Sequence, residues 1–459
     1  MYQLDFDKPC HVHFIGIGGI SMSGLASVLL DRGFEVSGSD SSESDLTELL
    51  RKEGAVVYIG QSAENIKDGI DLVVYTAAIK EDNPEFAEVI KRNIPMLKRA
   101  ELLGQMMKNY DIPIAIAGTH GKTTTTSMVT EVLLAGGKDP TVSVGGMLRS
   151  INGNIRVGHS PFFVAEACEY TNSFLSFFPK VGMILNIEED HMDFFKDIND
   201  IRQSFKKFGE LVPSDGIVII NADIDDLDEI TKDFSGRVIT YGKNKNADYH
   251  PESISFDEFA RPTFKAVSKE GEREFTLGVV GEHNVINALA AIALADAYDI
   301  PYEETYKALK GFTGTDRRFQ LKGTFNNGVT IIDDYAHHPT EIEMTLKAAK
   351  AYPHKRLICA FQPHTYTRTK AFLDDFAKAL SNADIIVLAE IYAAREKNTI
   401  GISSGAIKEK LDAMGKQCEY FHTFEEIENY LKKISSTGDL LITMGAGNIV
   451  DVGEDLLKE

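Results

Sequence analysis

The sequence predicts an α/β protein with mostly parallel β-sheets, arranged in three domains. Short apolar runs are followed by glycine-rich turns and then by helical stretches, and this order recurs along the chain. Such alternation is typical of parallel strands joined by helical crossovers. The chain has 459 residues, of which 43% are hydrophobic and 25% charged, as in a globular protein. At roughly 100–200 residues per domain, this length allows about two to four domains.

The first domain is predicted over residues 1–110. An apolar strand at residues 11–16 leads into a turn with Gly16, Gly18 and Gly19, and a helix follows at residues 22–31. A strand, a glycine turn and a helix in this order indicate a Rossmann-like fold. Further strands are expected at residues 36–40, 55–59 and 71–76.

The second and third domains are predicted over residues 111–313 and 314–459. Because the third repeats the order of strands and helices, a second Rossmann-like domain is expected there. Expected strands of the second domain are 114–117, 162–167, 181–187, 216–221 and 237–241, with helices at 122–134 and 284–297. Expected strands of the third are 329–333, 357–361, 385–389 and 440–443, with helices at 341–351 and 370–380.

Charge and cysteine content argue against several classes of protein. Lys and Arg total 48 and Asp and Glu 69, a net charge of −21, so nonspecific nucleic-acid binding through phosphates is not expected. The four cysteines are far apart, which argues against a disulfide framework or a Cys-based zinc site. No apolar run reaches the ~18 residues of a membrane span, and the first residues do not resemble a secretory signal. A cytoplasmic protein without a membrane partner is expected.

Residues 118–124, Gly-Thr-His-Gly-Lys-Thr-Thr, predict a phosphate-binding loop. They lie between an apolar strand and a helix, where backbone N–H groups and the helix N-terminus favour an anion. Lys122 is expected to reach the β- and γ-phosphates, and the Thr123 hydroxyl to bind Mg²⁺. Ile116 interrupts the full GxxxxGK[ST] pattern, so a structural turn is the alternative. The run of threonines 123–126 is a poor helix start, which hydroxyls facing a nucleotide would explain.

Polar residues at two other strand ends are candidate metal ligands. Glu166 lies at the end of one apolar strand, and His191 just past another. Mg²⁺ prefers oxygen ligands, so Glu166 is the natural candidate. Imidazole better suits softer metals, so His191 would be a less usual ligand. The alternative for both residues is a solvated loop position.

Three further motifs follow strands or begin helices. Residues 16–21 are near the GxGxxG pattern but end in Ser, with Asp40 at the next strand end; this turn could hold NAD or a sugar nucleotide. The amides of residues 281–287 could bind an adenine edge or belong to a helix cap. Arg368 follows an apolar strand and could neutralise a transferring phosphoryl group.

Taken in order, these motifs resemble those of the Mur ligase family over essentially the whole chain. One such motif would be weak evidence for the family, but the whole set in this order is specific to it. Thr365 stands where many relatives carry Arg, and residues 170–172 replace a more acidic stretch. The resemblance rests on residues 13–19, 118–124, 166–170, 190–193, 281–287, 317–319, 333–339, 362–369 and 444–447.

The resemblance implies a domain for a UDP-sugar, a central P-loop ATPase-like domain for ATP, and a domain for the incoming amino acid. The implied reaction joins L-alanine to the carboxylate of UDP-N-acetylmuramate through an acyl phosphate, in the synthesis of peptidoglycan precursors. ATP and Mg²⁺ are the implied cofactors, and the chain is expected to be a monomer or a homodimer.

By the same resemblance, the expected site residues fall into four groups. Tyr335 and His337 are expected near the growing acyl end. The catalytic group is Lys122, His191, His337, His364 and Arg368, and the metal ligands are Thr123, Glu166 and His191. The ATP group is Gly118, Thr119, His120, Gly121, Lys122, Thr123, Thr124, His283, Asn284, Asn287 and Arg318. The UDP-sugar group is Gly16, Gly18, Gly19, Ser39, Asp40, Thr76 and Ala77.

Other functions stay open from the sequence. The nearest is a family member that attaches a recycled murein peptide to UDP-N-acetylmuramate. A nicotinamide-dependent dehydrogenase would use residues 16–40, and an ATP-gated sensor of UDP-sugars would form no ADP. For the proton released by the attacking amine, His337, His338 and a substrate-bound water are all candidate acceptors.

Overall fold

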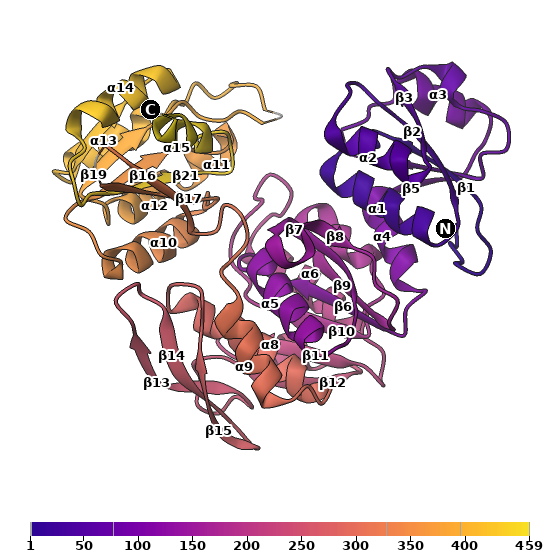
Figure 1. Cartoon of the computed structure of the whole chain (residues 1–459), viewed down its shortest axis with the longest axis horizontal. Coiled ribbons are helices and arrows are strands. Elements are labelled where there is room, and N and C mark those ends of the chain that lie inside the picture. Colours follow the sequence, from indigo (N-terminus) through magenta and orange to yellow (C-terminus); the bar gives the residue numbers. More distant parts are fainter. Residues whose placement is uncertain (1, 77, 327, 395, 459) are drawn as a thin grey trace. The chain divides into compact units, whose positions relative to one another are not determined.

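A computed structural model describes residues 2–76, 78–326, 328–394 and 396–458. These residues form four β-sheets, three of them mainly parallel (Figure 1). The α/β fold class predicted from the sequence is therefore confirmed.

The first sheet has five parallel strands in the order β3-β2-β1-β4-β5. In the central strand β1 (His11–Ile15), Val12, Phe14 and Ile15 are fully buried, as expected where helices cover both faces of a parallel sheet. The other strands are β2 Glu35–Asp40, β3 Val56–Ile59, β4 Leu72–Tyr75 and β5 Met96–Lys98. The helices are α1 Ile20–Asp31, α2 Asp45–Glu53, η1 Ala63–Asn65, α3 Pro84–Lys91 and α4 Arg99–Met107.

The second sheet has seven strands in the order β12-β11-β10-β6-β9-β7-β8. Strand β6 lies between β9 and β10 and is parallel to both, so the loops after these three strands meet at one edge. The strands are β6 Ile112–Ala117, β7 Thr141–Leu148, β8 Gly153–Arg156, β9 Phe162–Ala167, β10 Val181–Ile184, β11 Ile217–Asn221 and β12 Arg237–Tyr241. The helices are α5 Lys122–Ala135, η2 Arg149–Ile151, η3 Tyr170–Ser176, α6 Ile198–Glu210 and α7 Leu227–Thr231.

The third sheet is antiparallel and was not predicted. Its strands are β13 His250–Phe256, β14 Pro262–Ser268 and β15 Gly271–Thr276. Phe264 and Phe275 are paired across β14 and β15 and are fully buried, so they form the apolar face of this small sheet. Helices α8 (His283–Ala297) and α9 (Tyr302–Gly311) follow it in the chain.

The fourth sheet has six strands in the order β16-β17-β21-β18-β19-β20. Along β18 (Leu357–Phe361), Cys359 and Phe361 join one hydrophobic core while Ile358 and Ala360 join another, so both faces are covered. The other strands are β16 Gln320–Phe325, β17 Val329–Asp334, β19 Ile385–Leu388, β20 Gln417–Tyr420 and β21 Leu440–Met444. The helices are α10 Pro339–Ala351, α11 Tyr366–Ala371, α12 Leu373–Leu380, α13 Gly405–Ala413, α14 Phe424–Ile434 and α15 Val450–Leu457.

Two predicted elements were wrong in extent. The strand expected over residues 181–187 ends at Ile184, because the next residues turn to bond the loop after β6. The helix expected over residues 370–380 is two helices, α11 and α12. They are separated at Phe372, whose φ of −111° and ψ of 29° depart from helical geometry.

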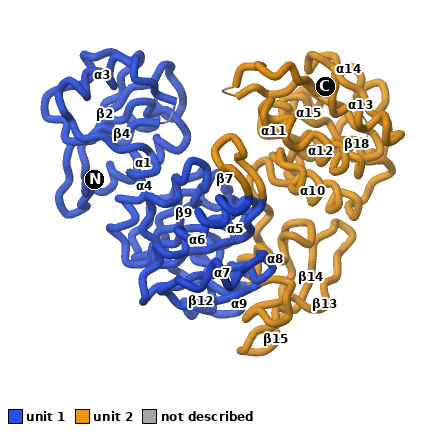
Figure 2. Tube along the Cα trace, turned by 180° about the vertical axis from the view of Figure 1, so that it is seen from behind, with its two compact units in different colours: residues 1–188, 198–241, 290–305 blue, residues 189–197, 242–289, 306–459 orange. Residues whose placement is uncertain are grey.

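The chain divides into two compact units, which Figure 2 colours separately. Residues 1–188, 198–241 and 290–305 form the first unit, and residues 189–197, 242–289 and 306–459 form the second. The domain boundaries at 110/111 and 313/314 stay predictions.

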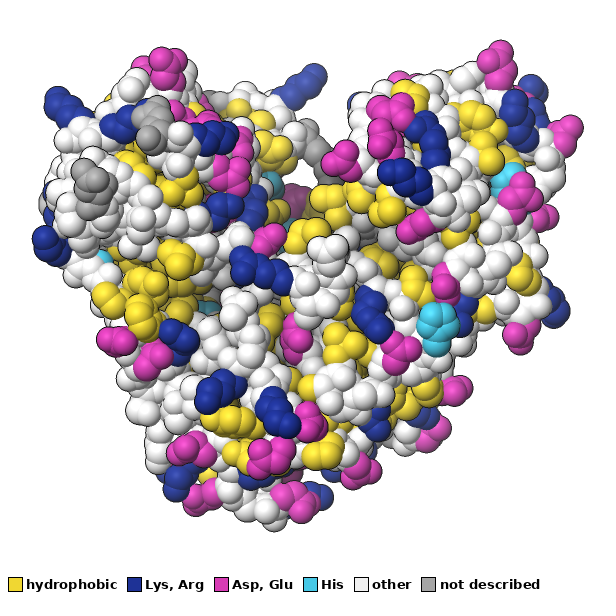
Figure 3. Space-filling view, in the orientation of Figure 1, with side chains coloured by type: hydrophobic (Ala, Val, Ile, Leu, Met, Phe, Trp, Pro, Cys, Tyr) yellow, Lys and Arg dark blue, Asp and Glu magenta, His cyan; other side chains and the backbone are white. Residues whose placement is uncertain are grey.

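The surface carries charges of both signs. On the face drawn in Figure 3, Lys and Arg side chains are interspersed with Asp and Glu. Of the helices in the described part of the chain, none is long and apolar enough to span a membrane.

Candidate active site

The loop between β6 and α5 is the predicted phosphate-binding loop. Gly118 and Gly121 have φ of +154° and +81°, a region that favours glycine. A Cβ at residue 118 would also lie 2.8 Å from Cβ of Leu185. Helix α5 begins at Lys122, and no side chain among the described residues caps it. Its first N–H groups can therefore bind an anion.

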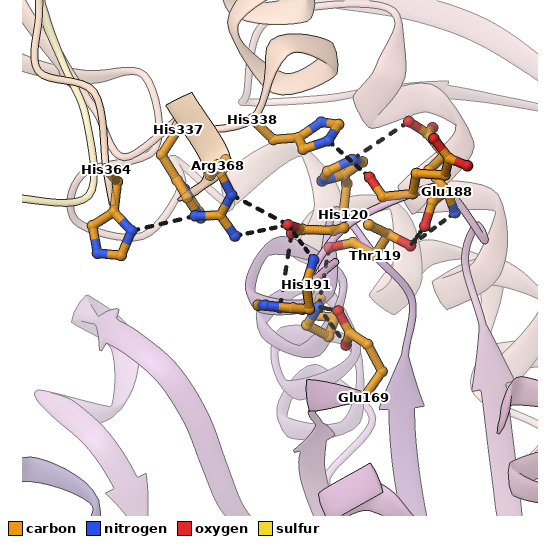
Figure 4. Close-up of polar contacts among 12 residues, drawn as sticks. Thr119, His120, Glu169, Glu188, His191, His337, His338, His364 and Arg368 are labelled. Atoms are coloured by element: carbon orange, nitrogen blue, oxygen red, sulfur yellow. Dashed lines mark hydrogen bonds and ion pairs between the residues drawn. The ribbon is translucent and has the colours of Figure 1, made fainter. Parts of the chain in front are cut away.

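The chain after β10 fixes this loop in position. The His120 amide donates to Oδ1 of Asn186 (2.7 Å), and Nδ2 of Asn186 donates to the His120 carbonyl (3.0 Å). The Glu188 amide donates to Oγ1 of Thr119 (2.9 Å), and Nε2 of His120 lies 3.5 Å from Oε2 of Glu188. These contacts, drawn in part in Figure 4, orient the loop before any ligand arrives.

Lys122 is half-buried and charged. Its Nζ donates to Oε2 of Glu169 (3.0 Å) and to the carbonyl oxygens of Thr119 (3.0 Å) and Gly118. Burial alone would lower the pKa of Lys122, but the charge and hydrogen bond of Glu169, together with Cys168 and Glu166, outweigh this effect, so the pKa is raised. The ammonium group therefore stays protonated at the start of α5, as phosphate binding requires.

Glu166 and Thr123 offer oxygen atoms near the same sheet edge. The Gly145 amide donates to Oε1 of Glu166 (2.7 Å), which orients the carboxylate. A Cβ at residue 145 would lie only 2.5 Å from Oε2, so the glycine makes room for it. Thr123 is the second residue of α5. A carboxylate and a hydroxyl suit Mg²⁺, which prefers oxygen ligands and keeps several waters.

The threonines of α5 do not all face outward. Thr124 is half-buried, whereas Thr125 and Thr126 are fully buried. The hydroxyls of Thr125 and Thr126 have no hydrogen-bond partner within the described residues. The expectation that the whole run faces a nucleotide is therefore wrong for these two residues, because the helix turns them into the protein.

In the second unit, Arg368 forms the centre of a polar cluster. Its Nη2 donates to Oδ1 of Asp190 (2.7 Å), and its Nη1 lies 3.3 Å from Nδ1 of His364. Burial would raise the pKa of Asp190, but the charge and hydrogen bond of Arg368, together with His191 and His338, outweigh this effect and hold the pKa well below its usual range. The His191 amide also donates to Asp190 (2.7 Å). One carboxylate therefore positions two of the predicted catalytic residues, Arg368 and His191 (Figure 4).

His337 and His338 make different hydrogen bonds. Nδ1 of His337 lies 3.1 Å from the Tyr335 carbonyl, which can only accept, so Nδ1 carries the proton and Nε2 keeps a lone pair. His338 uses both nitrogens, since Nε2 donates to the Glu189 carbonyl (3.0 Å) and Nδ1 accepts from the Thr340 amide (3.3 Å). Of the two imidazoles, His337 is thus the better placed to accept a proton.

Burial keeps two imidazoles of this cluster neutral. It lowers the pKa of His337 to about 3 and that of His364 to about 4. Their ring centroids are 5.7 Å apart. At neutral pH both rings are therefore uncharged and can accept a hydrogen bond.

The ring of Tyr335 contacts two arginines. The Cζ atoms of Arg317 and Arg318 are 4.9 and 5.3 Å from its ring centroid. Nε of Arg317 also donates to Oδ2 of Asp333 (2.9 Å). These cation–π contacts hold Arg318, predicted to bind ATP, next to Tyr335.

The predicted adenine-binding residues begin helix α8. Nδ2 of Asn284 donates to the Val280 carbonyl (2.8 Å), and Nδ2 of Asn287 donates to Oδ1 of Asn284 (3.0 Å). Burial lowers the pKa of His283 to about 4. The Asn284 side chain thus bonds back to the preceding loop rather than serving as a simple cap.

The first glycine turn is bonded to the end of β2. The Gly16 amide donates to the Ser39 carbonyl (2.8 Å), and the Gly18 amide donates to Oδ2 of Asp40 (2.8 Å). Gly16 has a φ of +86°, which favours glycine. Of the other residues predicted to bind the UDP-sugar, Gly19 precedes α1, Thr76 follows β4, and Ala77 lies outside the described residues.

Comparison with known proteins identifies the family. Models of three domains match in order: the Mur ligase family catalytic domain over residues 11–111, the Mur ligase middle domain over 116–295, and the Mur ligase glutamate ligase domain over 317–447. The chain belongs to the Mur ligase family. The predicted resemblance is thereby confirmed.

Several relatives of this Mur ligase match it along their full length. A UDP-N-acetylmuramate–L-alanine ligase of Agathobacter rectalis is 60% identical, and each chain is covered completely. The solved structure of UDP-N-acetylmuramate-alanine ligase MurC from Thermotoga maritima is 31% identical, with a TM-score of 0.80 and 98% of each chain covered. A murein peptide ligase from Psychrobacter arcticus is 25% identical, with a TM-score of 0.70 and 98% coverage of each chain.

Three polar contacts of this Mur ligase were not expected from its sequence. Glu169 pairs with Lys122, Asn186 holds the phosphate loop, and Asp190 pairs with Arg368. Asn186 and Asp190 both follow β10, so their place after an apolar strand was a usable signal. Glu169 follows β9 in the same way, although the sequence does not show that Lys122 is its partner.

Proposed function

We propose that the chain is a UDP-N-acetylmuramate–L-alanine ligase that uses ATP and Mg²⁺. The full-length identity of 60% to a relative of that name carries the proposal. The charged Lys122 at a phosphate loop supports the use of ATP. The peptide-attaching alternative is not favoured, because the murein peptide ligase structure is less similar in both identity and TM-score than the alanine ligase structure.

The chemistry proceeds in two steps. A carboxylate oxygen of the sugar nucleotide attacks the γ-phosphorus of ATP, and ADP leaves with the bond's electron pair. The L-alanine nitrogen then attacks the acyl carbon, a C–N bond forms, and phosphate leaves as the C–O bond breaks. The amine gives up a proton in this step, and Nε2 of His337 is the proposed acceptor because its lone pair is unused by the Tyr335 contact.

The chain supplies charge and position for both steps. Lys122 binds the β- and γ-phosphates, and Arg368 offsets negative charge on the transferring group. Thr123 and Glu166, with His191, are the proposed residues that hold Mg²⁺, which would neutralise phosphate charge. Amides of residues 118–124 bind the triphosphate. A cytoplasmic location is part of the proposal.

An acceptor panel with mass detection of the product tests the proposal. Phosphate release from ATP is expected only with UDP-N-acetylmuramate and L-alanine together, and the murein tripeptide should give no product. Lys122→Ala should lower turnover by roughly 100-fold or more while the protein stays folded. Product with the tripeptide but not with L-alanine would favour the alternative, and unchanged turnover in Lys122→Ala would refute the site.

A further inference from the structure

A buried carboxylate in the first sheet has no role in the chemistry above. Glu85 is the second residue of α3, and its side chain is completely buried, as is that of His13 in β1. Nε2 of His13 lies 3.5 Å from Oε2 of Glu85. Placing a carboxylate in the protein interior is unfavourable unless it is paired and hydrogen-bonded. The partners of Glu85 therefore indicate what it does.

Glu85 joins the loops that follow two neighbouring strands. Its Oε2 accepts from Oγ of Ser39 (2.6 Å), near the end of β2. Its Oε1 accepts from Nδ2 of Asn65 (2.6 Å) and from the Ser62 amide (3.3 Å), which both follow β3. Burial would raise the pKa of Glu85, but the contacts with His13, Ser39 and Asn65 outweigh it, so the pKa is lowered. The group is therefore an ionised acceptor of several donors.

These loops are in turn bonded to the first glycine turn. The Ser39 carbonyl accepts from the amides of Gly16 (2.8 Å) and Ile17 (2.9 Å). Nδ2 of Asn65 also donates to the Gly60 carbonyl (3.0 Å), and the Gly60 amide donates to the Asp40 carbonyl (2.8 Å). Oδ2 of Asp40 accepts from the Gly18 amide. Glu85 is thus linked through Ser39 and through Asn65 to both ends of the turn.

We propose that Glu85, backed by His13, is a positioning residue for the sugar-nucleotide diphosphate. Its carboxylate holds Ser39 and the loop at residues 60–62. Through their bonds to the amides of Gly16, Ile17 and Gly18, it fixes the turn and the start of α1 in the geometry that the ligand meets. The buried charge is useful because one acceptor can take hydrogen bonds from several donors at once. This inference rests on the proposed function, since it assumes that the turn binds a UDP-sugar.

Glu85→Gln tests the inference in the full-length enzyme. Nδ2 of Asn65 and the Ser62 amide can only donate, and the Ser39 hydroxyl must reorient to accept from the new NH₂ group, so these hydrogen bonds weaken and the loops loosen. KM for UDP-N-acetylmuramate should rise roughly tenfold, while kcat and KM for ATP stay within about twofold. Asn65→Ala removes one of the links and should raise the same KM by a smaller factor. Calorimetric titration with UDP-N-acetylmuramate should show the same loss of affinity.

Glu88→Gln is the matched control. Glu88 lies on the same helix but pairs with Lys91 and Arg92, away from the loops, so its substitution should leave all three constants unchanged. A folded Glu85→Gln variant with unchanged KM, or with only kcat reduced, would overturn the inference. If Glu85→Gln does not fold, an unchanged KM in Asn65→Ala would overturn it instead. A wild-type enzyme that makes no product at all would refute the proposed function rather than this role.

Discussion

Neighbouring histidines in this chain have different roles because their surroundings differ. His338 uses both ring nitrogens for hydrogen bonds, whereas His337 leaves Nε2 with a lone pair. Burial lowers the pKa of His337 to about 3. The sequence alone could not distinguish these two residues, because the distinction depends on the Glu189 carbonyl, which lies far away in the chain.

The lowered pKa of His337 predicts how stability depends on pH. Folding favours the neutral ring, so its contribution is complete above the unfolded pKa of about 6.5 and is lost as pH falls through 6.5 toward 3. Between pH 6.5 and 4 the loss is on the order of 3 kcal/mol. His337→Gln should therefore melt with a flatter pH dependence than the wild type over this range, measured by circular dichroism. His364→Gln should flatten it less, and equal slopes in all three proteins would contradict the pKa assignment.

At the scale of elements, apolar strands were predictable and polar ones were not. The strands at residues 162–167, 237–241 and 357–361 have the predicted bounds, because each contains a run of apolar or β-branched residues. Strand β15 has charged residues at 272–274 and one fully buried side chain, Phe275. Its strand character comes from pairing with β14 rather than from a sequence pattern.

The site could be predicted only where its residues lie together in the sequence. The proposed phosphate loop at residues 118–124 stands out in the sequence because its glycines, lysine and threonines follow one strand. The pairs Lys122–Glu169 and Asp190–Arg368 join distant segments, and nothing in the local sequence marks Glu169 or Asp190 as a partner. Buried Glu85 was missed for the same reason.

In strand β7, Gly145 lies so close to Glu166 that the effect of adding one methyl group near the proposed metal site can be predicted. In Gly145→Ala the new Cβ would lie 2.5 Å from Oε2 of Glu166, so the carboxylate must move and the Gly145 amide loses its acceptor. The Mg²⁺ concentration for half-maximal activity should rise roughly tenfold, as for other changes to groups that orient a metal ligand. A magnesium titration of initial rates measures this.

Gly153→Ala in the adjacent strand β8 provides the control. Its added Cβ would meet its nearest atom at 3.6 Å, an ordinary contact, so the magnesium requirement should not change. Equal magnesium dependence in Gly145→Ala and the wild type would show that Glu166 does not act as a metal ligand.

At the scale of the whole molecule, the proposed catalytic groups come from distant parts of one chain. Lys122, Thr123 and Glu166 belong to the first compact unit, and His191, His337 and Arg368 belong to the second. The family models match both units in a single chain. Each copy of the protein therefore carries a full set of these proposed groups.

A full set in each chain predicts the outcome of mixing two inactive variants. Lys122→Ala and Arg368→Ala, each purified and shown to be folded, should both lack activity, and their mixture should stay inactive if each chain works alone. If copies instead share groups across a dimer, about half of the dimers that form at random would contain one chain of each variant. Each of these mixed dimers would have one intact site out of two, so activity would recover to about a quarter of the wild-type value. Product formation measured over a range of total protein concentrations distinguishes the two cases, and dilution of wild type with either variant should lower activity in simple proportion.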